Sequence, residues 1–190
     1  EIAHPLKTSY SHYIVEGVQI SNPDKLVFTQ PNVTKFSLVQ YYDQVFFRMF
    51  PYLEKRLCST VRCPNGESFY KKHFDDVAKG MKKVLLQKDG EKRRDYYYIQ
   101  NKVGLISEVQ MNGYEFHIWG CKVKKMTRPD MMVFDLDPDE GLSLQKVREG
   151  VRDLKSILDE LGLVSFLKTS GGKGYHVVVP FTSFTSWKSF

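Results

Sequence analysis

The spacing of apolar residues along the chain predicts three helices and a set of short strands. Steps of three and four residues favour helices from Thr34 as N-cap to a stop at Pro51, over 103–109, and from Ser143 as N-cap to Gly162. Alternating positions favour strands over 12–20, 95–99, 114–119, 131–136, 164–168 and 175–179. The dipeptides at 16–17 and 89–90 are turn signals, so each predicts a hairpin.

This order of elements indicates an α+β (mixed α/β) fold. We expect a mixed sheet with flanking helices, because the pattern contains hairpins as well as a strand, helix, strand unit. A length of 190 residues with 42% hydrophobic residues suits a single domain over 1–190 with a buried core. The sequence contains no internal repeat and no interdomain linker.

Charge and cysteine content indicate which class of partner and which cellular compartment to expect. Twenty-eight Lys and Arg against 22 Asp and Glu give a net charge of +6, which favours a polyanionic partner without requiring one. Cys58, Cys63 and Cys121 lack the spacing of metal ligands, so we expect reduced thiols and a cytoplasmic protein. No apolar run approaches the roughly 18 residues of a membrane span, and the first residues have no signal-peptide character. Membrane insertion and secretion are therefore not expected.

Two carboxylates one residue apart are the first candidate for chemistry. Asp135 and Asp137 follow the apolar run Met131–Phe134, and Pro138 comes directly after them. Residues i and i+2 of a strand share a face, so both acids would point the same way while Leu136 turns into the core. Such a pair at the end of a strand is typical of a divalent-metal site. The alternative is a chance pair of solvated acids on an edge strand.

The segment Ser170–Gly174 is the second candidate. Its three glycines allow backbone N–H groups to approach an anion, while Ser170 and Lys173 add a hydroxyl donor and a cation. The segment is not a P-loop, because the Walker spacing is absent and a strand follows instead of a helix. A flexible hairpin loop is the alternative. His176 on the following strand could donate to phosphate oxygens, although a lone strand histidine is more often structural.

Histidine and aromatic side chains elsewhere each allow two interpretations. His117 would share a strand face with Glu115 and Trp119, where a core or interface histidine competes with a ligand-binding one. Phe69 and Tyr70 stand among cations, a grouping that resembles a stacking platform for nucleic acid. The alternative is an aromatic pair packed in the core beneath lysine stems.

Taken in order, these segments resemble one family, the polymerase domain of bacterial ligase D and its stand-alone relatives in the archaeo-eukaryotic primase superfamily. The resemblance covers nearly the whole chain. Its segments are SNPDK (21–25), TK (34–35), YY (41–42), RCPNG (62–66), SFYKKH (68–73), EFHIWG (115–120), RPD (128–130), FDLDP (134–138), LGL (161–163) and KTSGGKGYHVVVP (168–180). The FDLDP and KTSGGKGYHVVVP segments together are its specific part.

The resemblance implies a role for each candidate residue. The ligands of a divalent metal, Mn²⁺ or Mg²⁺, would be Asp135 and Asp137. The residues that hold an incoming NTP or dNTP would be His117 on the sugar side and Ser170, Gly171, Lys173 and His176 at the triphosphate. The residues that contact DNA would be Lys25 at a 5′-phosphate and Arg62, Phe69, Tyr70 and Lys72 near the template strand.

The same resemblance implies a primase-polymerase-like fold whose C-terminal part is missing here. In the family a third aspartate lies on a strand well downstream of the glycine loop, whereas this sequence ends at Phe190. We expect residues 1–100 to form a part that binds DNA ends and template, and residues 101–190 to form a portion of the catalytic core. A dimer that covers exposed sheet edges is a further expectation.

The leading hypothesis is a template-directed nucleotidyltransferase, a DNA/RNA primase-polymerase that fills or extends DNA ends in non-homologous end joining by a two-metal mechanism. The alternative is a non-catalytic fragment that binds DNA ends through their 5′-phosphate. The resemblance also implies a prokaryotic, nucleoid-associated location and, as partners, DNA ends or gaps, Ku and an ATP-dependent DNA ligase. Dehalogenase-type phosphatases and glycosyltransferases also use Asp-x-Asp, but the central position of the pair and the glycine loop argue against both.

Overall fold

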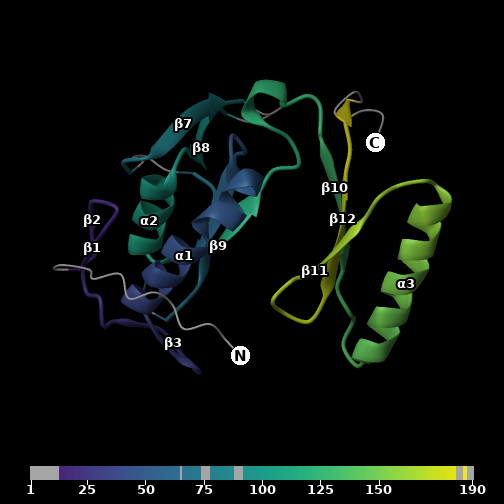
Figure 1. Ribbon diagram of the computed structural model, residues 1–190, viewed down its shortest axis with the longest axis horizontal. Coiled ribbons are helices and arrows are strands. Elements are labelled where there is room, and N and C mark those ends of the chain that lie inside the picture. The colour runs from purple at the N-terminus through teal and green to yellow at the C-terminus, as the bar shows by residue number, and fades with distance from the viewer. Residues whose placement is uncertain (1–12, 65, 74–77, 88–91, 183–185, 188–190) are drawn as a thin grey trace. The chain divides into compact units, whose positions relative to one another are not determined.

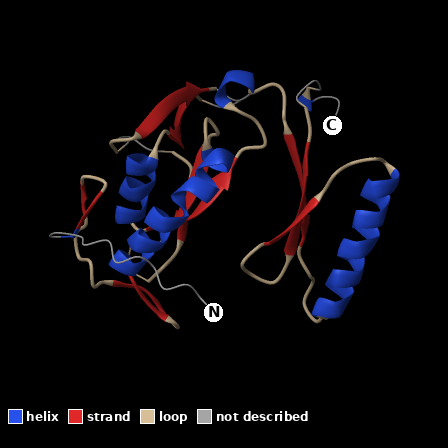
Figure 2. Cartoon of the chain, in the orientation of Figure 1, coloured by secondary structure: helices blue, strands red, loops and turns tan. Residues whose placement is uncertain are grey.

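The fold is described from a computed structural model, which describes residues 13–64, 66–73, 78–87, 92–182, 186 and 187 (Figure 1). The chain divides between Trp119 and Gly120 into two compact units. The functional division that we expect at residue 100 falls inside the first unit and stays a prediction. The chain contains both helices and strands, coloured in Figure 2, and the mixed α/β class is confirmed. No helix in the described ranges is long and apolar enough to cross a membrane.

The first unit holds two helices and four small sheets within its described residues. The helices are α1 (Lys35–Leu53) and α2 (Lys102–Gln110). The strands are β1 (Ile14–Val15), β2 (Val18–Gln19), β3 (Leu26–Thr29), β4 (Asn32–Thr34), β5 (Cys58–Arg62), β6 (Phe69–Lys71), β7 (Met81–Leu86), β8 (Arg94–Ile99) and β9 (Gly113–Ile118). They pair as β1-β2, β3-β4, β6-β5-β9 and β7-β8. The hairpin predicted at residues 16–17 is confirmed, whereas the turn predicted at 89–90 lies outside the described residues.

The second unit holds one three-stranded sheet, the short 3₁₀ helix η2 (Val123–Lys125) and helix α3 (Leu144–Glu160) among the residues described. Its strands are β10 (Met131–Leu136), β11 (Phe166–Thr169) and β12 (Tyr175–Pro180), in the order β10-β12-β11. Both pairings are antiparallel, as are all other strand pairs between described residues. The strand, helix, strand segment therefore gives no parallel pair here, because β12 lies between β10 and β11.

The predicted helix starts are confirmed, and one predicted stop is wrong. The Thr34 side chain accepts a bond from the Ser37 N–H, and Ser143 caps α3 in the same way. Helix α1 does not stop at Pro51 but continues to Leu53. Pro51 lies in the last turn, where its missing N–H removes only one bond and the buried Leu53 anchors the helix end.

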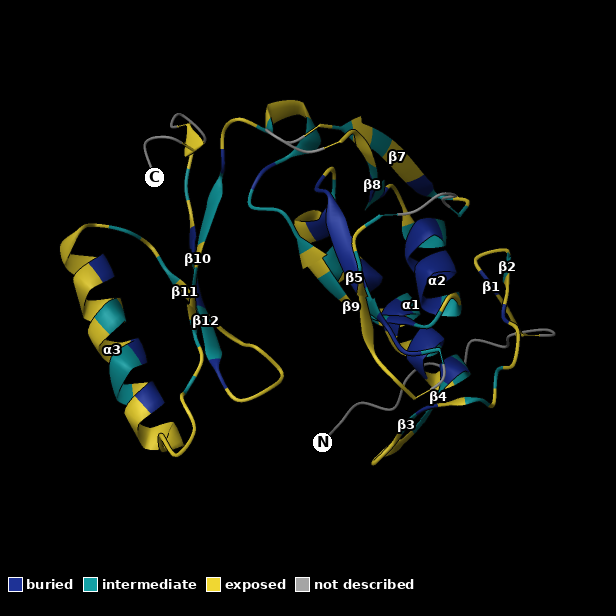
Figure 3. Ribbon diagram, turned by 180° about the vertical axis from the view of Figure 1, so that it is seen from behind, coloured by how far each residue is buried: buried dark blue, intermediate teal, exposed yellow. Residues whose placement is uncertain are grey.

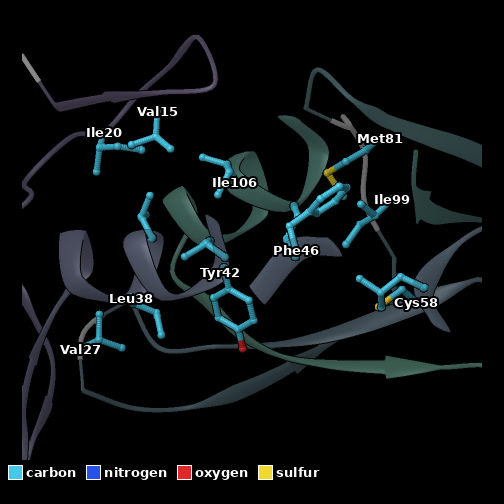
Figure 4. Close-up of a cluster of buried hydrophobic side chains, with 14 of the residues drawn as sticks. Val15, Ile20, Val27, Leu38, Tyr42, Phe46, Cys58, Met81, Ile99 and Ile106 are labelled. Atoms are coloured by element: carbon cyan, nitrogen blue, oxygen red, sulfur yellow. The ribbon is translucent and has the colours of Figure 1, made fainter. Parts of the chain in front are cut away.

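The core of the first unit lies between its two helices and the strands around them. Leu38, Tyr42 and Phe46 of α1 share this cluster with Ile106 of α2 (Figure 4). The backbones of Gly80 and Gly104 are so close that a Cβ on either glycine would collide with the other residue. Glycine at both positions therefore lets α2 pack against the start of β7. Cys58, Cys63 and Cys121 are free and buried.

In the second unit α3 covers one face of the sheet. Its buried positions face β12 (Figure 3), and Val151 and Leu158 pack with Val177 and Val179. Leu136 faces this core, as predicted. Strand β10 is buried on that face only, since Val133 on the opposite face is 43% exposed. The open face of the sheet is therefore available to carry polar side chains.

Candidate functional site

A row of polar side chains crosses the open face of the second unit's sheet. The strand register places Asp135 of β10 opposite His176 of β12, and His176 opposite Lys168 of β11. Directly opposite residues project from the same face of a sheet. The Oδ1 atom of Asp135 lies 3.2 Å from Nε2 of His176, and 59% of the Asp135 side chain is exposed. An acid, an imidazole and an amine thus stand side by side on a solvent-accessible surface.

The second aspartate adjoins the glycine loop. Asp137 comes one residue after the end of β10 and is exposed. The Gly174 backbone packs against it so closely that a Cβ at position 174 would collide with Oδ1 of Asp137 and with the carbonyl oxygen of Leu136. A glycine is required there because any side chain would displace the carboxylate. The structure thus brings together the two motifs that the sequence placed some thirty residues apart.

The Ser170 hydroxyl closes the glycine loop on itself. Its Oγ donates to the carbonyl oxygen of Gly174 at 3.0 Å and accepts from the N–H groups of Gly174 at 3.2 Å and Gly172 at 3.4 Å. Gly171 has a φ of +89°, which favours glycine. Ser170 therefore shapes the loop, whereas we expected it to donate to phosphate. Lys173 is exposed at the loop tip.

These residues suit a divalent cation as a partial ligand set. Asp135 and Asp137 supply carboxylate oxygens, the ligand type that Mg²⁺ and Mn²⁺ prefer. Mg²⁺ commonly takes one or two protein carboxylates and completes its shell with water and substrate phosphates. Within the described ranges, no group of three or more His, Cys, Asp or Glu residues could hold a metal ion. The open face therefore fits a metal that arrives with a phosphate ligand better than a closed structural site.

A second candidate surface lies on the sheet β6-β5-β9 of the first unit. The register places Tyr70, Glu115 and His117 on one face. The Tyr70 and His117 rings are 5.1 Å apart, Lys72 Nζ lies 5.3 Å from the centre of the Tyr70 ring, and Nε2 of His117 is 3.0 Å from Oε2 of Glu115. Tyr70 is 47% exposed, as is the His117 side chain. The core interpretation is therefore wrong for both residues.

The two predicted stacking aromatics do not form one platform. Phe69 is 45% exposed, but it lies opposite Arg62 in the register, whereas Tyr70 lies opposite Val61. Neighbouring strand residues project from opposite faces. Only Tyr70 therefore shares a face with His117.

Arg62 lies in the interior, unlike the backbone-binding cation that we expected. It is 7% exposed, and its Nε and Nη2 donate to the two carboxylate oxygens of Glu108 at 2.7 and 2.8 Å. Glu108 also accepts from Thr60 Oγ1 at 2.8 Å, and Tyr97 OH donates to that hydroxyl at 3.1 Å. A phosphate contact would require Arg62 to leave a buried bidentate pair, so this placement supports a structural role.

Lys25 and Lys35 lie together at the N-terminus of α1. The Lys35 N–H donates to the Lys25 carbonyl at 2.8 Å, the Phe36 N–H donates to that of Pro23 at 2.9 Å, and Lys25 Nζ donates to the Pro64 carbonyl. Lys35 is 3% exposed. Burial and the nearby charge of Lys25 lower the pKa of Lys35. An anion near this helix start would relieve the repulsion between the two cations, while the first N–H groups of the helix are already bonded to protein oxygens.

The sequence interpretation missed Lys35, Lys168 and Glu108. The role of Lys168 could be recognised only from the register of β11 against β12. The role of Glu108 could be recognised only from its contact with Arg62, 46 residues away in the sequence. Only Lys35 had a signal in the sequence, because it directly follows the predicted N-cap Thr34 and therefore lies at a helix start.

Comparisons with known proteins identify the family of this chain. The family model described as "LigD, primase-polymerase domain" matches residues 34–190. The chain therefore belongs to the LigD primase-polymerase domain family, a nucleotidyltransferase family, as its sequence resemblance predicted.

Curated relatives are much longer than this chain. The multifunctional non-homologous end joining protein LigD of Pseudomonas aeruginosa is 34% identical over 177 residues, which cover 90% of this chain and 21% of that protein. The corresponding protein of Mycolicibacterium smegmatis is 29% identical, with 87% and 22% covered. The bifunctional LigD of Bacillus subtilis is 28% identical, with 86% and 26% covered. The chain thus spans between a fifth and about a quarter of these relatives.

A solved structure shares the fold. The polymerase domain from Mycobacterium tuberculosis ligase D, determined in complex with DNA, superimposes with a TM-score of 0.81 and is 26% identical in sequence. The match covers 90% of this chain and 64% of that one.

Proposed function

We propose that this chain acts in template-directed nucleotidyl transfer, filling or extending DNA ends during non-homologous end joining. The observation that carries the proposal is the packing of Gly174 against Asp137, beside the row formed by Asp135, His176 and Lys168. Carboxylates and phosphate-binding cations that adjoin on one open face are the groups that transfer of a nucleotide requires. Membership of the LigD primase-polymerase domain family supports this interpretation.

Each side chain on this face has a chemical task in the proposal. Asp135 and Asp137 hold a divalent cation, Mg²⁺ or Mn²⁺, which when bound neutralises charge on the triphosphate of an NTP or dNTP. His176, Lys168 and Lys173 bind phosphate oxygens. Ser170 and Gly171 keep the loop closed and so hold Gly174 against the carboxylate.

The first unit supplies the contacts to DNA in this proposal. Tyr70 offers an exposed ring for base stacking, and Lys72 places a cation beside it for the backbone. Lys25 binds a 5′-phosphate near the start of α1, where the buried Lys35 adds positive potential. His117, oriented by Glu115, offers an exposed imidazole for a sugar hydroxyl.

Partners and location form part of the same proposal. Relatives with this domain are named non-homologous end joining proteins, which supports DNA ends as the target. Ku and an ATP-dependent ligase are the partners that the sequence resemblance implies. We place the protein in the prokaryotic cytoplasm at the nucleoid, where three free cysteines suit a reducing compartment.

The test is nucleotide addition to a gapped duplex that carries a 5′-phosphate, in the presence of Mn²⁺ or Mg²⁺. Asp135→Asn should lower the rate by at least about 100-fold, the loss typical when a charged group of an active site is removed. Asp139→Asn, the same change at an exposed residue of the following turn, should keep the rate. Equal rates for the two variants would contradict the assigned role of Asp135.

A second candidate function is DNA-end binding without catalysis. It is favoured by the lack of a third protein ligand in the described ranges, where no metal-binding group of three residues occurs. In this case a 5′-phosphorylated gap would bind with unchanged affinity in Asp135→Asn, and the unmodified chain would add no nucleotide.

A further inference from the structure

A groove runs between α3 and the edge strand β11 of the second unit. It has a volume of about 390 Å³, and its lining includes the apolar residues Val151, Leu167 and Val177 and the cations Arg152 and Lys155. We call this feature the α3–β11 groove. Leu167 and Val177 are opposite each other in the strand register, on the face that α3 covers. The groove therefore lies on the opposite side of the sheet from Asp135 and His176.

The outer edge of β11 borders this groove. In the order β10-β12-β11, β11 pairs with β12 on one side and is the last strand among the described residues. All four of its residues are exposed, with Phe166 at 58% and Leu167 at 59%. An edge strand presents outward N–H and C=O groups that can pair with an incoming strand. The outer edge of β11, which can pair with a strand, thus lies next to the α3–β11 groove, which can hold side chains.

The lining has features that select for an occupant. Its described residues include two cations, Arg152 and Lys155, and no carboxylate, although Lys155 also pairs with Asp159 outside the groove. Ser165 lines it too, and its Oγ is buried with no hydrogen-bond partner in the described part of the chain. A ligand that supplies a hydrogen-bond partner to this hydroxyl would remove the energetic cost of leaving it unpaired. Val151, Leu167 and Val177 favour apolar side chains in the groove, and Arg152 and Lys155 favour acidic ones.

We propose that the α3–β11 groove binds an extended acidic peptide segment of a partner protein, which pairs as an added strand along β11. Successive side chains of a strand point to opposite faces, so every second residue would enter the groove beside Leu167. The intervening residues would lie next to Phe166 and Lys168 on the other face. The residues that enter the groove are therefore aliphatic beside Val151 and Leu167 and acidic beside Arg152 and Lys155.

Other occupants fit the lining less well. A single-stranded nucleic acid would need aromatic surfaces for stacking, and none of the described residues that line the groove is aromatic. A second copy of this chain would bring two sets of Arg152, Lys155 and Lys168 together, at a cost in repulsion. A short edge strand with a lysine likewise discourages pairing with neutral or basic strands.

The test uses the full chain, labelled with ¹⁵N, and the capped peptide Ac-Thr-Glu-Thr-Val-Thr-Glu-NH₂ as probe, in which Glu and Val share the face that enters the groove. Its binding should shift the amide signals of β11 and of 151–156. Arg152→Glu should weaken binding about fivefold, in line with exposed charge pairs. Lys124→Glu makes the same charge change at an exposed position of η2 and should leave the affinity unchanged. A peptide with Lys in place of Glu, or with Pro in place of Val, should not bind.

Several results would overturn the proposal. One is the absence of shifts at β11 with millimolar probe while the rest of the spectrum stays native. Another is equal binding of the proline peptide, which would exclude pairing along the strand. Equal affinities of Arg152→Glu and Lys124→Glu would exclude the charge argument. Shifts at the same amides that depend on protein concentration alone would identify a second copy as the occupant.

Discussion

The buried pair between Arg62 and Glu108 gives a prediction that separates stability from DNA binding. Arg62 is 7% exposed and Glu108 1%, and Glu108 accepts three hydrogen bonds of 2.7 to 2.8 Å. Removing one partner leaves the other charge buried without compensation, which typically costs about 3–5 kcal/mol. Arg62→Met should therefore lower the free energy of unfolding by about 3–5 kcal/mol.

The double variant tests the cause. Arg62→Met with Glu108→Met removes both charges, and such replacements are often neutral or stabilising. Most of the lost stability should therefore return. Thr60 keeps a partner in this variant, since the Tyr97 hydroxyl donates to it. Burial, with a smaller effect of nearby Glu108, raises the pKa of Tyr97, so this hydroxyl stays protonated.

The assay is urea denaturation followed by circular dichroism, together with binding of a 5′-phosphorylated gapped duplex at a temperature where each variant is folded. Lys82→Met removes an exposed cation from the same unit and should change stability by less than about 0.5 kcal/mol. The reasoning would be refuted if Arg62→Met unfolded at the same urea concentration as the parent chain but bound DNA poorly. That result would make Arg62 a DNA contact.

Two further predictions concern single side chains. Gly174→Ala should lower nucleotide addition and cost about 1–3 kcal/mol of stability, because its Cβ meets Asp137; the same change at Gly172, where only Ser170 Oγ at 3.9 Å lies within reach, should be tolerated. Because burial and Lys25 lower the pKa of Lys35 from its usual 10.5, the unfolded chain binds more protons than the folded one just below that pH. Lys35 should therefore add a contribution to stability that rises with pH there, measured by urea denaturation as the difference between the parent chain and Lys35→Met at several pH values. Burial raises the pKa values of Cys58, Tyr42 and Tyr97 in both chains, so their effect on stability cancels in this difference. A difference that stays constant or falls with pH would contradict the prediction.

Features that depend on neighbouring residues were predictable from the sequence. Thr34 and Ser143 cap their helices because a side-chain oxygen reaches an N–H three residues on. The hairpin at Glu16–Gly17 forms because both residues adopt positive φ, at 51° and 74°. The position of Asp135 on the open face of β10 was predictable from alternation, whereas Asp137 follows the end of the strand and its role as a second ligand stays a prediction.

Features that depend on distant partners were not predictable in the same way. Arg62 occurs in a segment rich in cations, and its burial follows only from Glu108, 46 residues later in α2. Phe69 and Tyr70 are adjacent in sequence, yet the pairing of β6 with β5 sends them to opposite faces. The length of α1 past Pro51 depends on the burial of Leu53 in the core. In each case tertiary packing outweighs the local pattern.

The buried face of the second sheet determines what its open face can do. Val177 and Val179 must face α3, and this requirement fixes the register of β12. A slip by one residue would expose these valines and turn His176 into the core, so it is opposed by the burial of the whole apolar set. The meeting of His176 with Asp135 is thus a consequence of hydrophobic packing on the other side of the sheet. Substitutions of residues that pack between α3 and β12 should therefore disturb the carboxylate site, although these residues lie on the other face of the sheet.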